Sequence, residues 1–248
     1  MICQICDNKM LEGKWNVVKK QFIEVQGNNT WRCPNCEHIF VNYEESGLEF
    51  HKNEWRKKHG GRGGIKFDKE FHKLRSVINK KRCNVMIKHL KDLKECDSLL
   101  DMGSGGGSFL LKLKDLNLFK KIEAQEISVD CINYLKELKF KTYEGDFSKI
   151  IFPHKYDVLT SWHVMEHVKN VKTLAKKMSE VTKKYLIVEV PVAKRGNGGY
   201  DRNPKKTFNG HFHFFTEKSM TLLFKDYFDD YQVHEAIQKP SLQIIFKK

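Results

Sequence analysis

The stretch that decides the fold is SLLDMGSGGGSF, residues 98–109. Its apolar start predicts a buried strand over residues 98–101, and the apolar spacing that follows predicts a helix from Phe109 to Phe119. Four glycines fill the turn between them, and because they carry no Cβ they let the backbone approach a ligand closely. A strand, a glycine-rich turn and a helix in this order are typical of α/β domains that bind nucleotides.

Acidic residues close the next two predicted strands. Residues 121–125 are expected to form a second strand that ends at Glu126, where a carboxylate can accept hydrogen bonds from both hydroxyls of a ribose. A third short strand is expected to end at Asp146. The sequence therefore predicts a row of polar groups at one edge of a parallel sheet.

Five segments resemble, in order, the motifs of class I S-adenosylmethionine-dependent methyltransferases. They are LLDMGSGGGSFL (99–110), AQEIS (124–128), EGDF (144–147), YDVLTSWHVMEHV (156–168) and LIVEVP (186–191). A nicotinamide-binding domain, by contrast, usually carries G-x-G-x-x-G without an aspartate two residues before the first glycine. The resemblance covers the chain from about residue 90 onward. It implies an α/β fold with a Rossmann-like class I methyltransferase sheet.

The resemblance also implies which residues bind the cofactor S-adenosylmethionine. Asp101, Gly103 and Gly105 would shape the methionine pocket. Glu126 would hold the ribose, in place of the commoner aspartate, and Asp146 with Phe147 would face the adenine.

A candidate catalytic group follows the fourth strand, where the chain is expected to open a helix. His163, Glu166 and His167 are spaced i, i+3 and i+4, so they would share one helix face. The Glu-His pair resembles that of ubiquinone-biosynthesis O-methyltransferases and sugar methyltransferases. This implies either a general base, His167, or a second divalent cation held by His163, Glu166 and His167, although metal-binding relatives tend to carry glutamate at the position of His163. The alternative is that the pair only orders the wall of the site.

Residues 191–215 show little periodicity, and loops of that length in a compact domain are usually functional or disordered. Because the loop follows the fifth strand, we expect Arg195, His211 and His213 to bind substrate, with packing histidines as the alternative. A helix is then expected over residues 217–227, and a closing hairpin over residues 233–246.

Four cysteines near the N-terminus form two C-x2-C pairs, Cys3 with Cys6 and Cys33 with Cys36. Two residues between thiolates let both sulfurs reach one ion, and two such pairs complete a tetrahedral shell. We therefore predict a small zinc-ribbon domain over residues 1–45 that holds structural zinc. A redox dithiol is the alternative, but neither pair lies in the strand–helix context of a thioredoxin-like motif.

A basic linker and helix are expected over residues 46–95, ahead of the methyltransferase domain at 96–248. Residues 52–95 carry 15 Lys and Arg against 5 Asp and Glu, within a chain whose net charge is +14. Such a surplus indicates an anionic partner, which could be nucleic acid, a phosphorylated metabolite or an acidic glycan. A solvated, lysine-rich helix is the alternative.

Composition narrows the class further. No apolar run approaches the roughly 18–20 residues of a membrane span, and the start MICQICDNKM lacks the pattern of a secretory signal. We therefore expect a cytoplasmic protein with no membrane association. Our preferred interpretation is methyl transfer to a hydroxyl of a small molecule or sugar. The alternative is an RNA methyltransferase that binds RNA through the basic bridge and the zinc module.

Overall fold

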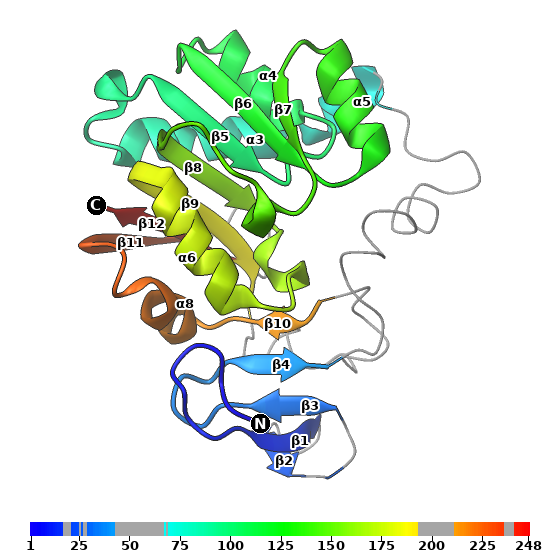
Figure 1. Ribbon diagram of the computed structural model, residues 1–248, viewed down its shortest axis with the longest axis vertical. Coiled ribbons are helices and arrows are strands. Elements are labelled where there is room, and N and C mark those ends of the chain that lie inside the picture. Colours follow the sequence, from blue (N-terminus) through cyan, green and yellow to red (C-terminus); the bar gives the residue numbers. More distant parts are fainter. Residues whose placement is uncertain are drawn as a thin grey trace.

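The computed structural model describes residues 1–16, 21–24, 26, 29–42, 67, 69–192, 211–235 and 241–248. Its larger sheet has seven strands in the order β11-β12-β9-β8-β5-β6-β7 (Figure 1). The strands are β5 (Ser98–Met102), β6 (Lys121–Glu126), β7 (Lys141–Glu144), β8 (Tyr156–Trp162), β9 (Thr182–Pro191), β11 (Asp230–Glu235) and β12 (Ser241–Lys247). The pairs among β5, β6, β7, β8 and β9 are parallel, whereas β12 runs antiparallel to both β9 and β11.

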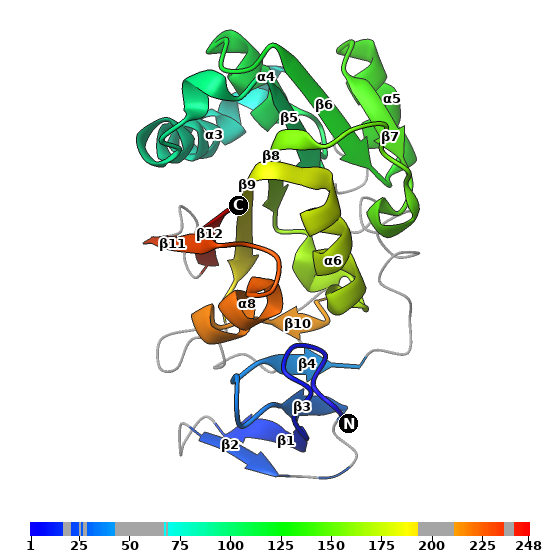
Figure 2. The same cartoon turned by 60° about the vertical axis from the view of Figure 1, so that its left-hand side comes forward.

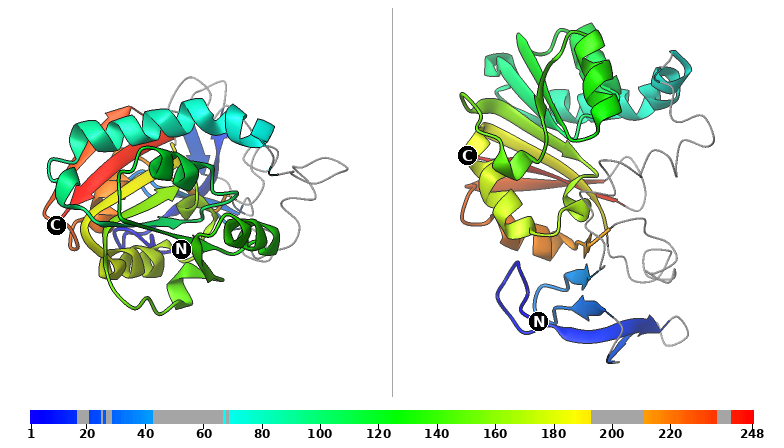
Figure 3. Two further views of the ribbon diagram at one scale, coloured as in Figure 1. Left: turned by 90° about the horizontal axis from the view of Figure 1, so that it is seen from above. Right: turned by 45° about the vertical axis from the view of Figure 1, so that its right-hand side comes forward.

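Helices cover both faces of this sheet, because alternate residues of each strand point to opposite sides. Leu99 packs with α3, α4 and α5 on one face, whereas its neighbour Leu100 packs with α6 and α8 on the other. Figure 3 shows these two helical layers with the sheet between them. The helices are α3 (Lys69–His89), α4 (Ser108–Asp115), α5 (Val129–Glu137), α6 (Val171–Val181) and α8 (Glu217–Phe224).

The strand order reverses direction beside β5. From β5 the chain moves outward through β6 to β7, and it then returns to place β8 on the other side of β5. In open α/β sheets, ligands bind at the carboxyl ends of the strands at such a reversal. The glycine-rich turn of residues 103–107 lies directly after β5, at that end of the sheet.

A second sheet joins the N-terminal residues to the rest of the chain. It has the order β10-β4-β3-β1-β2 and comprises β1 (Leu11–Asn16), β2 (Gln21–Glu24), β3 (Thr30–Arg32), β4 (Ile39–Val41) and β10 (His213–Phe214). Figure 2 shows β10, which follows β9 in the chain, lying against β4. The second sheet is therefore built from both ends of the sequence.

Several predicted elements differ from the structure at their ends. The predicted helix from Phe109 to Phe119 ends at Asp115, and the helix predicted from residue 217 ends at Phe224. Asp146 lies beyond the end of β7 and caps the short 3-10 turn η4 (Phe147–Lys149). The linker segment at 46–66 lies outside the described residues. Among the described helices, none is long and apolar enough to cross a membrane.

Candidate functional site

The glycine-rich turn leaves space beside its backbone. Gly105 has φ +55°, and a Cβ built there would meet nothing within 4 Å. At Gly103, with φ +69°, a Cβ would instead lie 2.5 Å from Cγ2 of Val164, so the turn packs closely against the segment after β8. A left-handed φ favours glycine at both positions. The open space at Gly105 is what a bound cofactor requires of this turn.

Carboxylates lie near the ends of β5 and β6, the two strands that adjoin the glycine-rich turn. Asp101, at the end of β5, is buried and accepts a hydrogen bond from Oγ1 of Thr160 at 2.7 Å. Burial raises the pKa of Asp101 to about 7, although the hydrogen bond from Thr160 opposes the rise. Glu126, the last residue of β6, accepts a hydrogen bond from the backbone N–H of Gly105 at 2.7 Å. A hydrogen bond therefore joins Glu126, the residue predicted to bind the ribose, to the glycine-rich turn.

The adenine side lies one strand further out. Asp146 accepts hydrogen bonds from the backbone N–H and the hydroxyl of Ser148, which fix its side chain at the start of η4. Phe147 is buried among residues that contact α6. Gly145 has φ +99° and open space where a Cβ would lie. Open space beside Gly105 and Gly145 and the carboxylates of Glu126 and Asp146 are thus found where the resemblance predicts the cofactor.

Across the glycine-rich turn, three side chains form a cluster that could hold a metal ion. Glu166, His167 and His211 each offer a ligand atom, and these atoms lie within 4.8 Å of one another. Glu166 is fully buried, and its Oε2 has no hydrogen-bond partner among the described residues. The rings of His167 and His211 lie 4.5 Å apart between centroids. One carboxylate and two imidazoles are a common ligand set for divalent transition metals.

His163 does not join this cluster as predicted. Residues 165–167 form a short 3-10 turn, η5 (Met165–His167), and not the predicted helix, and His163 precedes it with φ +57°. Its ring lies between two carboxylates, 3.3 Å from Oε1 of Glu166 and 3.0 Å from Oε1 of Glu189. Although burial alone would lower it, these hydrogen bonds raise the pKa of His163 to about 9. The two carboxylates therefore favour the protonated form of His163.

Two residues that sequence reasoning missed complete this buried charge network. Glu189, on β9, also accepts a hydrogen bond from Arg82 of α3 at 3.2 Å, and Arg82 lies over the ring of Trp162 at 4.4 Å from its centroid. Burial raises the pKa of Glu189, but His163 and Arg82 outweigh it and hold that pKa below its usual range. A charged residue in the otherwise apolar run LIVEVP was the available signal for Glu189.

Of the remaining predicted substrate residues, the structure describes His213, which is not part of the cluster. His213 is fully buried in β10, and its Nε2 donates to the carbonyl oxygen of Val168 at 2.9 Å. Burial lowers the pKa of His213 to about 4. Its other ring nitrogen faces Nε2 of His38 at 3.0 Å. Its described contacts are thus with protein groups. Arg195 lies outside the described residues.

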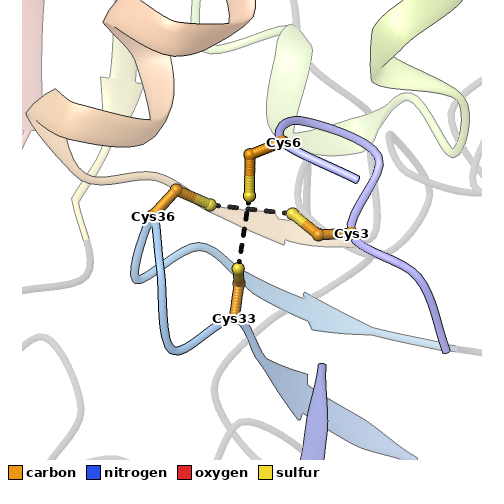
Figure 4. Close-up of side chains that lie close together, drawn as sticks. All are labelled: Cys3, Cys6, Cys33 and Cys36. Carbon is orange, nitrogen blue, oxygen red and sulfur yellow. Dashed lines mark hydrogen bonds between the residues drawn. The ribbon is translucent and has the colours of Figure 1, made fainter. Parts of the chain in front are cut away.

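The four N-terminal cysteines converge on one point (Figure 4). The Sγ atoms of Cys3 and Cys36 are 3.6 Å apart, those of Cys6 and Cys33 are 3.5 Å apart, and all four lie within 4.8 Å of one another. A tetrahedral zinc site with Zn–S bonds of about 2.3 Å requires sulfurs about 3.8 Å apart. The hydrogen bond between Sγ of Cys3 and Sγ of Cys36 lowers the pKa of Cys3 to about 5 and raises the pKa of Cys36. The donor set and spacing fit zinc.

A Rossmann-like sheet of this strand order, with a glycine-rich turn and carboxylates at the ends of β5, β6 and β7, defines a class I S-adenosylmethionine-dependent methyltransferase. A sequence model of the methyltransferase domain matches residues 69–230, so the chain belongs to that family. No curated protein matches it.

Solved structures share the fold at low identity. A magnesium protoporphyrin IX methyltransferase from Synechocystis PCC 6803 with bound S-adenosylhomocysteine is 13% identical, with 81% of this chain and 97% of that chain covered and a TM-score of 0.57. An amino pentose methyltransferase from Micromonospora echinaspora is 13% identical, with 78% and 95% covered and a TM-score of 0.55. The methyltransferase domain of a bacterial Hen1 protein is 20% identical, with 69% and 100% covered and a TM-score of 0.52.

Proposed function

We propose that this methyltransferase transfers the methyl group of S-adenosylmethionine to a hydroxyl of a small molecule or sugar. The observation that carries the proposal is the cluster of Glu166, His167 and His211, which adjoins the cofactor turn. The link is Val164, which precedes η5 and packs against Gly103. A hydroxyl bound at the cluster would therefore lie beside the methyl donor.

The cluster fits a divalent cation better than a carboxylate-oriented base. A base held by a carboxylate needs a hydrogen bond of about 2.6–3.2 Å, whereas Nε2 of His167 lies 3.9 Å from Oε1 of Glu166. Oε2 of Glu166 is buried and has no hydrogen-bond partner among the described residues, and an ionised oxygen in that position is costly unless a cation or donor meets it. We therefore propose a cation held by Glu166, His167 and His211, with His211 in the place first predicted for His163.

The sulfonium of S-adenosylmethionine already activates the methyl group, so the protein has two tasks. It aligns the acceptor oxygen for in-line displacement, and it favours loss of the hydroxyl proton. A divalent cation would do both, because it orients a bound oxygen and lowers its pKa. In the alternative without a cation, His167 accepts the proton itself.

One experiment separates these cases. The purified protein is incubated with S-adenosylmethionine labelled on the methyl group and with fractionated small-molecule extract, with and without EDTA and added Mn²⁺. We expect label in a small product, loss of transfer in EDTA and its return with Mn²⁺, with S-adenosylhomocysteine binding unchanged throughout. Transfer that is insensitive to EDTA but lost in His167→Ala would favour the base. No label in any small molecule would contradict the proposal.

RNA is the second candidate acceptor, and the basic helix α3 is the observation in its favour. Lys73, Lys80, Lys81 and Lys88 are exposed along it. The same exposed surface also displays Leu74, which is 74% exposed, and Val77, which is 63% exposed, so it is not a purely electrostatic surface. Adding total RNA as a parallel acceptor in the labelling assay tests this candidate directly.

A further inference from the structure

The four-cysteine module consists of Cys3, Cys6, Cys33 and Cys36 with the strands β1 to β4. It contacts the segment that carries Glu166 and His167. The side chain of Gln4, which lies between the first pair of cysteines, donates to the carbonyl oxygen of Lys169 at 3.1 Å. Its Oε1 accepts from the backbone N–H of Val171, also at 3.1 Å. Both hydrogen bonds fall within five residues after Glu166, where η5 turns into α6. The first cysteine pair is thus joined to the loop behind the cluster.

The second cysteine pair is joined to the segment that carries His211. After Cys36 the chain forms β4, which pairs with β10 so that His213 lies opposite Phe40 and Phe214 opposite Ile39. The backbone N–H of Val41 donates to the carbonyl oxygen of Phe212 at 2.8 Å. The carbonyl oxygen of Cys36 itself accepts from the hydroxyl of Thr216 at 2.9 Å. His211 is the residue just before this paired segment.

The segment that carries Glu166 and His167 and the segment that carries His211 also bond to each other where the module meets them. The backbone N–H of Phe212 donates to the carbonyl oxygen of Glu166 at 2.8 Å. Since Nε2 of His213 donates to the carbonyl oxygen of Val168, its Nδ1 must accept the proton of Nε2 of His38. The tautomers of both buried rings follow from this chain of donors. A histidine of the module therefore bonds to a histidine of the catalytic domain.

A single ion at the cysteines would tie these two attachments together. Sγ of Cys6, on the Gln4 side, lies 3.5 Å from Sγ of Cys33, on the β4 side. Without the ion, the described residues hold the two sides to each other by short strands, thiol hydrogen bonds and the packing of Ile5 and Met10 in one cluster with Phe40. Small modules of this kind depend on their metal for folding. The position of Gln4 relative to β4 is then no longer fixed.

We propose that the four-cysteine module is a positioning part of the acceptor site, which helps to set the distance of His211 from Glu166 and His167. The proposal rests on the proposed function for the role of that cluster, but the mechanical link stands on the hydrogen bonds alone. Loss of the ion loosens both attachments, so that the bonds of Phe212 to Glu166 and of His213 to Val168 are left to hold the two segments together. Among the described residues, the hydrogen bonds of the module go to the segments of Glu166 and His211 and not to the ends of β5, β6 and β7, so the affinity for the cofactor is kept.

The test uses the full chain in three variants. Cys6→Ala removes the least buried of the four thiolates. Gln4→Ala removes the attachment to Lys169 and Val171 but leaves every cysteine in place. Cys83→Ala is the control for loss of a buried thiol elsewhere. Zinc content, S-adenosylhomocysteine affinity by calorimetry, Mn²⁺ affinity by paramagnetic resonance and amide hydrogen exchange are measured on each.

In Cys6→Ala we expect loss of zinc, unchanged S-adenosylhomocysteine affinity and faster exchange at the amides of Val171 and Phe212. Mn²⁺ affinity should fall about tenfold or more, as for other groups that orient metal ligands. Gln4→Ala should keep zinc and cofactor affinity, yet shift exchange at Val171 and Mn²⁺ affinity in the same direction. Cys83→Ala should match wild type in Mn²⁺ affinity.

Unchanged exchange at Phe212 and Val171 in a zinc-free Cys6→Ala protein would overturn the proposal. So would a Cys6→Ala protein that unfolds altogether beside a Gln4→Ala protein identical to wild type, because the module would then act on global stability alone. Absence of Mn²⁺ binding in wild type would instead refute the proposed cation, and the exchange measurements would still decide whether the module positions the two segments.

Discussion

A methyl group added at Gly105 should block the cofactor while leaving the fold nearly intact. Gly105 has φ +55°, and a left-handed conformation costs an alanine about 1 kcal/mol. Its Cβ would meet no protein atom within 4 Å, so no packing penalty is added. For a chain of this size, about 1 kcal/mol lowers Tm by roughly 2–4 °C.

The affinity should respond much more strongly than the stability. If S-adenosylmethionine fills the space beside Gly105, the new methyl group overpacks it, at a cost of about 1–3 kcal/mol. That cost corresponds to a roughly 5- to 150-fold rise in Kd. Isothermal calorimetry with S-adenosylhomocysteine measures the affinity, and thermal unfolding without ligand measures the stability.

Gly107→Ala is the matched control, because it should show the opposite pattern. Gly107 also has a left-handed φ, +71°, but a Cβ there would lie 2.9 Å from Cδ2 of Leu135 in the core. We expect a greater loss of stability than for Gly105→Ala, with Kd close to wild type. If Gly105→Ala binds S-adenosylhomocysteine as wild type does, the space at this turn does not belong to the cofactor and the reasoning is wrong.

Three further predictions follow from buried charges and from the surface. Burial raises the pKa of Asp101 in the folded protein to about 7, above its usual 3.8, so its contribution to the stability of the ligand-free protein is present below pH 3.8 and is lost as pH rises through 7. Urea unfolding measures this loss. Relative to Asp101→Asn, the wild type should lose up to about 1.4 kcal/mol of stability per pH unit in that window. Glu189→Gln should lower the free energy of unfolding by about 3–5 kcal/mol, because it leaves Arg82 and His163 without their shared carboxylate. An unchanged urea midpoint would contradict this. The control Lys120→Ala, which breaks an exposed ion pair, should have no measurable effect. RNA should bind weakly and take up no methyl label; a log–log salt slope of about −4 or steeper with labelled RNA would instead favour the RNA acceptor.

The sequence predicts the seven-stranded sheet well, because each of its strands carries a strong local signal. The glycine-rich turn fixes where β5 ends, and the apolar runs fix β8 and β9. Helix ends are less certain: Leu116 continues the apolar spacing of α4, but the helix has already ended at Asp115. Apolar periodicity reports which residues face the core, not which backbone hydrogen bonds continue.

The acceptor side could be predicted only in part. Glu166 and His167 stand next to each other in a recognisable motif, but a left-handed residue at 163 breaks the predicted helix and turns His163 toward Glu189. The pairing of β10 with β4 joins segments more than 170 residues apart through a two-residue strand. No local pattern reports so short and so distant a pairing, and it is this pairing that adjoins His211.

The buried charges next to the cluster bear on which acceptor it favours. The network joins two basic side chains, Arg82 and His163, to two acidic ones, Glu166 and Glu189, so their formal charges balance before any cation binds. A divalent ion on Glu166 and two neutral imidazoles would therefore leave a net positive charge at the cluster. Such a site stabilises an oxygen that has lost its proton, since the developing alkoxide offsets part of that charge. A neutral amine gains less there, because it bears no negative charge when it attacks, which is the physical reason that a hydroxyl is the acceptor we propose.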